Sequence, residues 1–122
     1  MLVIVYGIPQ GVSSLQLNTD FRPGLAAVIA EAAGPDVLPS EIDIFTPLEN
    51  LGDAEYPMQQ KRIFVVIENY SQYVAIEDAE KVSARIAQAV SEKIREFLFA
   101  RNCTIKCIVR HRPQTGLTYD CL

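Results

Sequence analysis

The sequence predicts an α/β fold made of two consecutive βαβ units, with four strands in one sheet and two helices on one face of that sheet. Apolar, β-branched runs begin at residues 2 and 62 of the 122-residue chain, about half a chain length apart. Each run is followed by a helical pattern and then by a second strand pattern. The two halves, 1–60 and 61–122, share a layout rather than a sequence, so we expect a pseudo-repeat within a single domain over 1–122.

Two strands are predicted in the first half. Residues 2–8 are apolar and β-branched, which favours a buried strand that stops at Pro9. Residues 41–46 alternate polar and apolar and predict a half-buried strand. A crossover helix between the two strands makes them parallel, with right-handed chirality. Residues 10–19 are polar and small, and we expect a loop there.

A helix is predicted over 20–33. Asp20 is expected to cap it, and Pro23 suits a first turn, where its missing N–H has no partner to lose. Apolar residues recur at helical spacing after this start, and Gly34 followed by Pro35 provides the stop signal.

The second half begins after a long loop over 47–60, a length that is uncommon in a loop without a purpose such as lining a site. A buried strand is predicted over 61–68, a long amphipathic helix over 77–100 and a strand over 104–109. The tail over 112–122 is compatible with a short extra strand or a hairpin.

The second face of the predicted sheet is apolar. Ile4, Phe64 and Val66 lie on the opposite side of their strands from the neighbouring valines and isoleucines, so the first and third strands have apolar groups on both faces. The sequence supplies no third helix to cover this second face. The pattern therefore predicts that the chain associates with copies of itself.

Composition excludes several classes of partner. The net charge is −4 and the eleven cations form no basic stripe, so nucleic acid is not an expected partner. No apolar run reaches the roughly 18 residues that a membrane span needs. The amino-terminal residues lack the charged leader of a signal peptide. Three cysteines give no disulfide framework, which favours a cytoplasmic location.

No metal or cofactor site is predicted. The sequence contains no Gly-rich phosphate loop, no Ser/His/Asp cue and no paired carboxylate motif. Cys103, Cys107 and His111 share one side of the last predicted strand, but residues four apart on a strand are about 13 Å apart. Zinc ligands lie about 2.0–2.3 Å from their ion. Packing in the core or at an interface explains this spacing better.

His111 lies between Arg110 and Arg112, and the repulsion between these cations and the imidazolium favours a lowered pKa for the imidazole. The residue could act as a base or bind an anion. A solvated strand end is the alternative interpretation.

The layout resembles that of the tautomerase superfamily, which includes the 4-oxalocrotonate tautomerases and macrophage migration inhibitory factor. The resemblance covers nearly the whole chain but rests on layout. The matching segments are residues 2–9, the helix near 20–33, the strand near 41–46 and residues 77–90. Residues 56–58, Tyr-Pro-Met, also resemble one branch of that fold. The resemblance implies a homotrimer that needs no cofactor and binds a small carboxylate or keto acid between subunits.

The catalytic residue that the resemblance implies is absent. In the family, a proline exposed as the new amino terminus has a depressed pKa and moves a proton along an enol or enone. Leu2 occupies that position here, and Met1 is expected to stay because methionine removal requires a small second residue. Met1 then offers a primary amine, displaced by one residue. Pro9 cannot substitute, because its nitrogen is blocked.

Four further residues are candidates for substrate binding. Related enzymes bind the substrate carboxylate with a cation in the region of Arg22, although a solvated surface arginine is an alternative. Lys61 and Arg62 open the third strand, where they could face an anion or act as gatekeepers at the strand end. Tyr56 could cap a neighbouring subunit's site or pack at an interface.

Three functional hypotheses remain open from the sequence. The first is a keto–enol tautomerase or isomerase that acts on a small carboxylate or keto acid without the standard proline base. The second is a non-catalytic oligomeric ligand-binding or assembly module on the same fold. The third is a regulatory trimer with two βαβ units that binds metabolites in the loop over 47–60.

Overall fold

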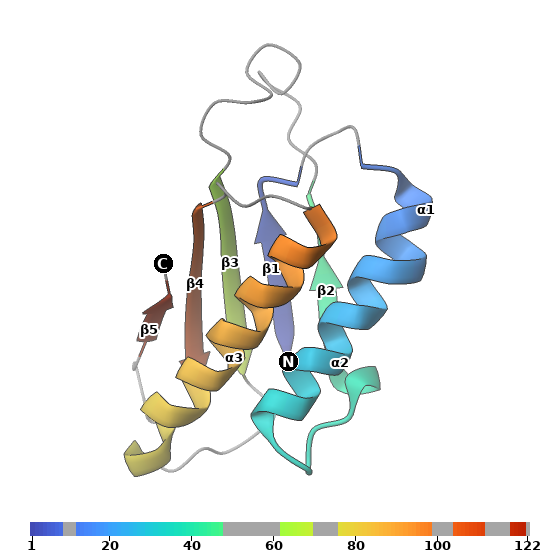
Figure 1. Ribbon diagram of the computed structural model, residues 1–122. Coiled ribbons are helices and arrows are strands. Elements are labelled where there is room, and N and C mark those ends of the chain that lie inside the picture. The colour runs from blue at the N-terminus through green and yellow to red at the C-terminus, as the bar shows by residue number, and fades with distance from the viewer. Residues whose placement is uncertain (9–11, 48–61, 70–75, 99–103, 112–117, 122) are drawn as a thin grey trace.

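The computed structural model describes residues 1–8, 12–47, 62–69, 76–98, 104–111 and 118–121. Five strands form one sheet in the order β2–β1–β3–β4–β5 (Figure 1). The strands are β1 (Leu2–Tyr6), β2 (Asp43–Phe45), β3 (Arg62–Asn69), β4 (Thr104–His111) and β5 (Thr118–Cys121). The helical elements are α1 (Ser14–Gln16), the π-helix η1 (Leu17–Phe21), α2 (Arg22–Ala33), the 3₁₀-helix η2 (Pro39–Glu41) and α3 (Ile76–Leu98).

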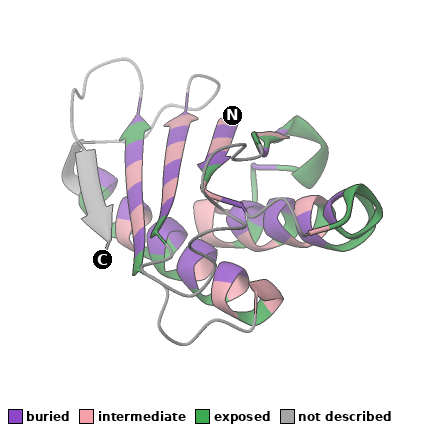
Figure 2. Cartoon of the chain, turned by 90° about the horizontal axis from the view of Figure 1, so that it is seen from above, coloured by how far each residue is buried: buried purple, intermediate pink, exposed green. Residues whose placement is uncertain are grey.

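The strand pairing has the two-βαβ layout. β1 pairs parallel with β2, β3 pairs parallel with β4, and β1 and β3 meet antiparallel in the middle of the sheet. The helices of both halves lie on one face of the sheet (Figures 1 and 2). The predicted fold class is confirmed, and the tail adds the short extra strand β5 antiparallel to β4.

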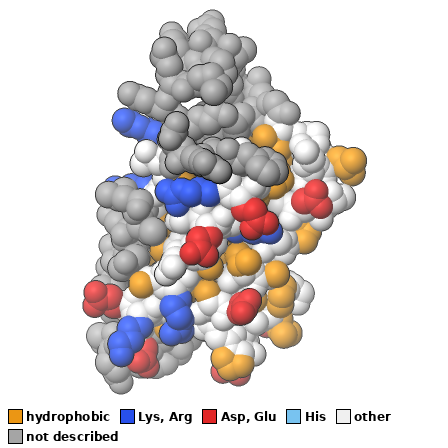
Figure 3. All heavy atoms as spheres, viewed as in Figure 1, with side chains coloured by type: hydrophobic (Ala, Val, Ile, Leu, Met, Phe, Trp, Pro, Cys, Tyr) orange, Lys and Arg blue, Asp and Glu red, His pale blue; other side chains and the backbone are white. Residues whose placement is uncertain are grey.

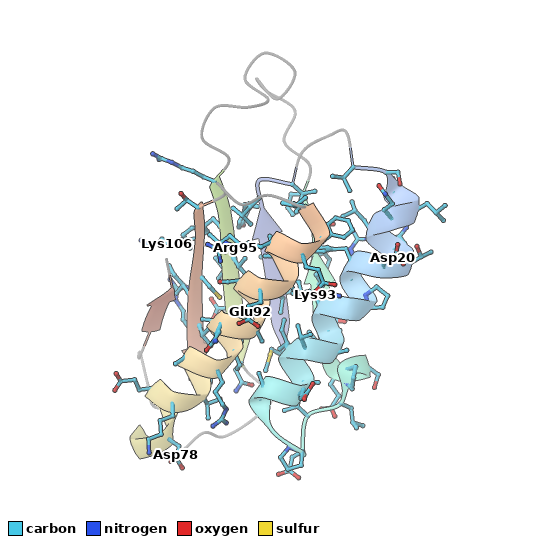
Figure 4. The ribbon with its side chains drawn as sticks, viewed as in Figure 1. Asp20, Asp78, Glu92, Lys93, Arg95 and Lys106 are labelled. Carbon is cyan, nitrogen blue, oxygen red and sulfur yellow. The ribbon has the colours of Figure 1, made fainter. Side chains whose placement is uncertain are left out.

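The first helix begins earlier than the sequence pattern predicts. Ser13 is its N-cap: its hydroxyl accepts from the backbone N–H of Gln16 at 3.1 Å, in a capping box. The helix then runs without a break from Ser14 to Ala33. The predicted loop over 10–19 is therefore wrong from Ser14 onward. Asp20 is not a cap, because it lies inside the π-helix and points away from the sheet (Figure 4).

Pro23 explains why the helix widens before it. The Pro23 nitrogen cannot donate to a carbonyl of the preceding turn. The chain accommodates this with a π-turn, in which the N–H of Arg22 donates to the carbonyl of Leu17, five residues earlier. The sequence pattern predicts Pro23 in a first turn, and this prediction is wrong because Pro23 lies within a continuous helix. Gly34 ends the helix as predicted, at φ +130°.

The core lies between the sheet and the helices (Figure 2). Alternate residues of β1, β3 and β4 point at α2 and α3 and are almost fully buried. They are Val3, Val5, Ile63, Val65, Ile67, Ile105, Cys107 and Val109. The helices contribute a second set: Phe21, Leu25, Ile29, Ile86, Val90 and Ile94. Burial of one such side chain stabilises the fold by about 1.5–3 kcal/mol.

The other face of the sheet carries no described helix. Strand register places Phe45, Ile4, Val66 and Ile108 side by side across four strands. We call this set the open-face row. Tyr6 and Phe64 extend it toward one end, with ring centroids 6.3 Å apart. The middle of the second face is therefore apolar, as the alternation of the sequence predicts, and Arg62, Glu68 and Arg110 lie toward the ends of its strands.

Candidate functional site

The structure divides the predicted site residues between opposite ends of the sheet. Met1 and Leu2 lie where β1 begins, level with Asn69 at the end of the antiparallel strand β3. Arg22 contacts Thr46, which follows β2, and Arg62 opens β3 at this same far end. Thr46 lies four residues along β2 from the level of Met1, or about 13 Å. Tyr56 and Lys61 lie outside the described residues.

Met1 is held as a structural part of β1. Its terminal amine donates to the carbonyl of Glu41 at 3.0 Å, and its own carbonyl accepts from the N–H of Asp43 at 2.9 Å. The Met1 side chain is 8% exposed and belongs to the core. Leu2 points to the open face and is half-buried. The amine that the resemblance marks as the base therefore joins the start of β1 to η2 and β2.

Arg22 is positioned by the π-turn and held by neutral partners. Nη1 of its guanidinium donates to Oδ1 of Asn18, one turn earlier, and Nη2 donates to the hydroxyl of Thr46. Nε is buried and has no hydrogen-bond partner. No carboxylate of the described chain forms an ion pair with Arg22. Among the described residues the half-buried guanidinium thus has hydrogen-bond partners but no ion-pair partner, which is unfavourable unless something offsets its charge.

A cavity of about 300 Å³ opens beside Arg22, between the start of α2 and the outer edge of β2. Its polar lining consists of Arg22, Asn18 and Asp43. Its apolar lining consists of Pro23, Ala26, Ile42, Ile44 and Phe45. This volume is at the small end for ligand pockets. The cavity has a cation at one side and apolar side chains around it. It is therefore complementary to a small acid whose carboxylate accepts hydrogen bonds from the guanidinium.

A second hollow, of about 430 Å³, lies between α2 and α3 on the outer helix face. Both of its cations already have partners: Arg85 donates to the carbonyl of Ala32 at 3.1 Å, and Lys93 lies 3.7 Å from Glu96. Lys93 reaches across to α2, close to Gly24 (Figure 4). Acidic and basic side chains are interspersed over the described part of this face (Figure 3). In the second hollow each cation therefore has a hydrogen-bond or ion-pair partner, and carboxylates share the lining with them.

Arg62 does not join Arg22 in one site. Its neighbour Ile63 points into the core, so Arg62 points to the open side of the sheet, where it is exposed. Its carbonyl faces Gly7, whose φ is +96° and whose added Cβ would lie 2.3 Å from that oxygen. This close approach fixes where β3 begins relative to β1.

His111 lies in the core rather than at a solvated strand end, so that alternative interpretation is wrong. The residue is 4% exposed. Nε2 lies 2.7 Å from the hydroxyl oxygen of Ser83 on α3, and Nδ1 lies 3.1 Å from Nδ2 of Asn69 on β3. The pKa of the imidazole is lowered, as predicted, but the cause is burial. Arg110 points to the opposite face, where it pairs with Glu68 at 3.0 Å.

Sequence reasoning missed the neutral residues around both basic groups. Asn18 and Thr46 hold Arg22, and Asn69 and Ser83 hold His111. Only Ser83 carries a signal in the sequence, because it is a polar residue within the apolar stripe of the long helix. The described residues contain no group of three potential metal ligands. None of the described helices has the length and apolarity to cross a bilayer.

Comparison with solved structures identifies the fold. A fused 4-OT wild-type symmetric trimer, W0, superposes with a TM-score of 0.67 at 18% identity, over 96% of each chain. Pt0534 inactivated by 2-oxo-3-pentynoate superposes at 0.63 and 10% identity, over 96% of this chain and 92% of that one. The macrophage migration inhibitory factor of Toxoplasma gondii superposes at 0.56 and 12% identity, over 98% and 100%.

The chain therefore has the fold shared by 4-OT tautomerase and macrophage migration inhibitory factor structures, and the predicted resemblance is confirmed at the level of the fold. No protein-family model and no curated protein matches the sequence.

Proposed function

We propose that this chain is a non-catalytic, homo-oligomeric binding module on the tautomerase fold, and that it binds a small monocarboxylic acid in the cavity beside Arg22. The observation that carries this proposal is the half-buried guanidinium, which has neutral partners, one unpartnered buried N–H and an adjacent cavity. A bound carboxylate would supply the missing counter-charge through charge-assisted hydrogen bonds.

The lining of the cavity limits the acid. The apolar side chains of β2 and α2 favour a hydrocarbon body, and the volume of about 300 Å³ keeps it small. Asp43 also lines the cavity, and its carboxylate repels a second negative charge. A monocarboxylate is therefore preferred over a dicarboxylate. In this proposal Arg22 binds the carboxylate, and Asp43 disfavours acids that carry a second negative charge.

The arrangement argues against proton transfer by the amino terminus within one subunit. The Met1 amine lies about 13 Å along the sheet from the level of Thr46 and Arg22, and it donates to the carbonyl of Glu41. A general base must come within about 3 Å of the proton that it removes.

A tautomerase acting on a small keto acid is the second candidate, because the fold is that of tautomerases and a carboxylate site is compatible with a keto-acid substrate. It predicts turnover of phenylpyruvate or 2-hydroxymuconate that acetylation of the Met1 amine abolishes. In that case Tyr56, Lys61 and Arg62 are further candidates for substrate contacts, with Leu2 beside the base.

Self-association is part of the proposal. The open-face row supplies an apolar surface of the kind that a closed assembly covers, and fused 4-OT structures of the same fold are trimers. We propose a homotrimer in the cytoplasm, with each chain acting as one domain.

Calorimetric titration tests the binding proposal. 3-Phenylpropanoate is the probe, 3-phenylpropanamide is its uncharged counterpart and succinate is the dicarboxylate. We expect binding of the monocarboxylate alone, and at least a tenfold weaker affinity in Arg22→Gln. Arg85→Gln removes the same charge from the second hollow and should bind normally. Equal binding of acid and amide, or unchanged binding by Arg22→Gln, would contradict the proposal.

A further inference from the structure

Three polar side chains meet at one end of the core, away from the Arg22 cavity. His111 ends β4, Asn69 ends β3 beside it, and Ser83 lies above both on α3. They are 4%, 2% and 0% exposed. Strand register places Asn69 and His111 directly opposite each other. The cluster therefore ties the ends of two strands to the helix that covers them.

The hydrogen bonds define one protonation state of His111. The amide nitrogen of Asn69 is a donor, so Nδ1 of the imidazole must accept from it. The remaining ring hydrogen is then on Nε2, which donates to the Ser83 hydroxyl oxygen at 2.7 Å. The neutral imidazole satisfies both contacts. A second proton, on Nδ1, would point at the Asn69 amide hydrogens and break the contact with β3.

The charged side chains on the described elements next to His111 point away from it. On β3 and β4 the adjacent charges, Glu68 and Arg110, lie on the other face of the sheet and pair with each other. On α3 the nearby Glu80 and Lys81 are exposed, while Ser83 points inward. On β1 the terminal amine of Met1 donates to the carbonyl of Glu41. Burial accordingly lowers the pKa of the imidazole.

We propose that Asn69, Ser83 and His111 form an acid-sensitive latch, which holds the ends of β3 and β4 against α3 while His111 is neutral and opens when His111 takes up a proton. Opening releases the end of β4, from which the chain continues toward the edge strand β5. α3 packs on β4 and β5, so both strands lose part of their attachment. The amino-terminal half and the Arg22 cavity lie on β1, β2 and α2 and stay in place.

His111 is the single histidine of the chain, so its ring protons can be followed by NMR without assignment. The latch predicts that His111 titrates below 6.5, the ordinary value for histidine. Asn69→Asp replaces the donor at Nδ1 with a carboxylate of the same shape, which accepts from the protonated ring. We therefore expect the pKa of His111 to be higher in this variant than in the wild type. Titration at or above 6.5 in the wild type, or an unchanged pKa in Asn69→Asp, would overturn the proposal.

Hydrogen exchange tests whether the latch opens. His111→Gln keeps an amide at this position but cannot titrate, so comparison at equal pH removes the intrinsic effect of pH on exchange. At pH 7.5, β5 amides of His111→Gln should exchange at least tenfold faster than those of the wild type, because the variant lacks both ring contacts of the latch. At pH 5, wild-type exchange in β5 should approach that of the variant, with β1 and β2 unchanged. Equal ratios at both pH values, or acceleration spread evenly over the chain, would overturn the latch.

Asn69→Asp supplies an independent readout in the same exchange experiment. Its acidic partner should keep the latch closed at pH 5, so β5 exchange should stay slow. If Asn69→Asp does not fold, Ser83→Ala replaces it: loss of the Nε2 partner should accelerate β5 exchange already at pH 7.5. Slow exchange in Ser83→Ala at pH 7.5 would contradict a role for this hydrogen bond.

Discussion

The terminal amine of Met1 lies 3.0 Å from the carbonyl oxygen of Glu41, forty residues away in the sequence, and donates a hydrogen bond to it. This contact places the first residue of the chain against η2 and aligns β1 with β2. The amino terminus is therefore a structural junction within the first βαβ unit. A change at the terminal amine should therefore affect the stability of the fold and leave ligand binding at Arg22 unchanged.

Extension of the chain by Gly-Ser before Met1 should weaken the fold but not the binding of a small acid. The extension replaces a charged donor by a neutral amide at a nearly buried position, and we expect a loss of about 1 kcal/mol in the free energy of unfolding. Urea denaturation measures this loss, and calorimetry measures the affinity for 3-phenylpropanoate. Loss of affinity with an unchanged urea midpoint would place the ligand at the amino terminus instead.

Gly7→Ala should destabilise the chain more than Gly34→Ala does. Both glycines have a positive φ, +96° and +130°, which strains any other residue. At Gly7 the new Cβ would also meet the carbonyl oxygen of Arg62 at 2.3 Å, whereas at Gly34 it meets nothing within 4 Å. We expect the free energy of unfolding to fall by at least about 3 kcal/mol in Gly7→Ala and by about 1–2 kcal/mol in Gly34→Ala. Equal midpoints in thermal unfolding would show that the contact between β1 and β3 is looser than described.

Val66→Lys should convert the assembly to monomers. Val66 lies at the centre of the open-face row, and a buried unpaired ammonium would oppose closure of any interface there. Gln88→Lys adds the same charge at an exposed site on α3 and serves as the control. Sedimentation velocity should show a monomer for Val66→Lys and an oligomer for the wild type and for Gln88→Lys. A wild-type monomer would contradict the proposed assembly.

The free energy of unfolding should decrease as the pH falls below 6.5. The folded-state pKa of His111 is lowered by burial, so in this range the unfolded chain binds a proton that the folded chain does not. The contribution of neutral His111 to the free energy of unfolding is fully present above pH 6.5. It is lost as the pH falls from 6.5 to the folded-state pKa, at up to about 1.36 kcal/mol per pH unit. The difference between the wild type and His111→Gln isolates it from the carboxylates. A difference that does not change between pH 7.5 and 5 would contradict burial of a neutral imidazole.

The strand layout could be predicted from the sequence because alternation and β-branched runs are local signals. Val3, Val5 and Ile63 face the core as expected, and Ile4 and Val66 form the apolar second face. The start of the first helix could not be placed from these signals. Pro23 indicates a first turn, and nothing local shows that a π-turn lets it lie inside a longer helix.

The candidate site was only partly predictable. The resemblance pointed to Arg22, but its partner Thr46 is 24 residues away and becomes a neighbour only when α2 packs against β2. Likewise, strand register brings Asn69 to His111, 42 residues apart, and helix packing brings Ser83. Such contacts depend on tertiary packing, which a single sequence does not display.

Deuterium exchange at C3 of phenylpyruvate tests whether the chain is non-catalytic, because it reports proton transfer whether or not product accumulates. The measurement is made in D₂O by NMR, with enough protein to keep the ligand bound at the Arg22 cavity. We expect the exchange rate of the buffer alone, in the wild type and in Arg22→Gln. Faster exchange in the wild type that disappears on acetylation of the Met1 amine would contradict this expectation and establish a tautomerase.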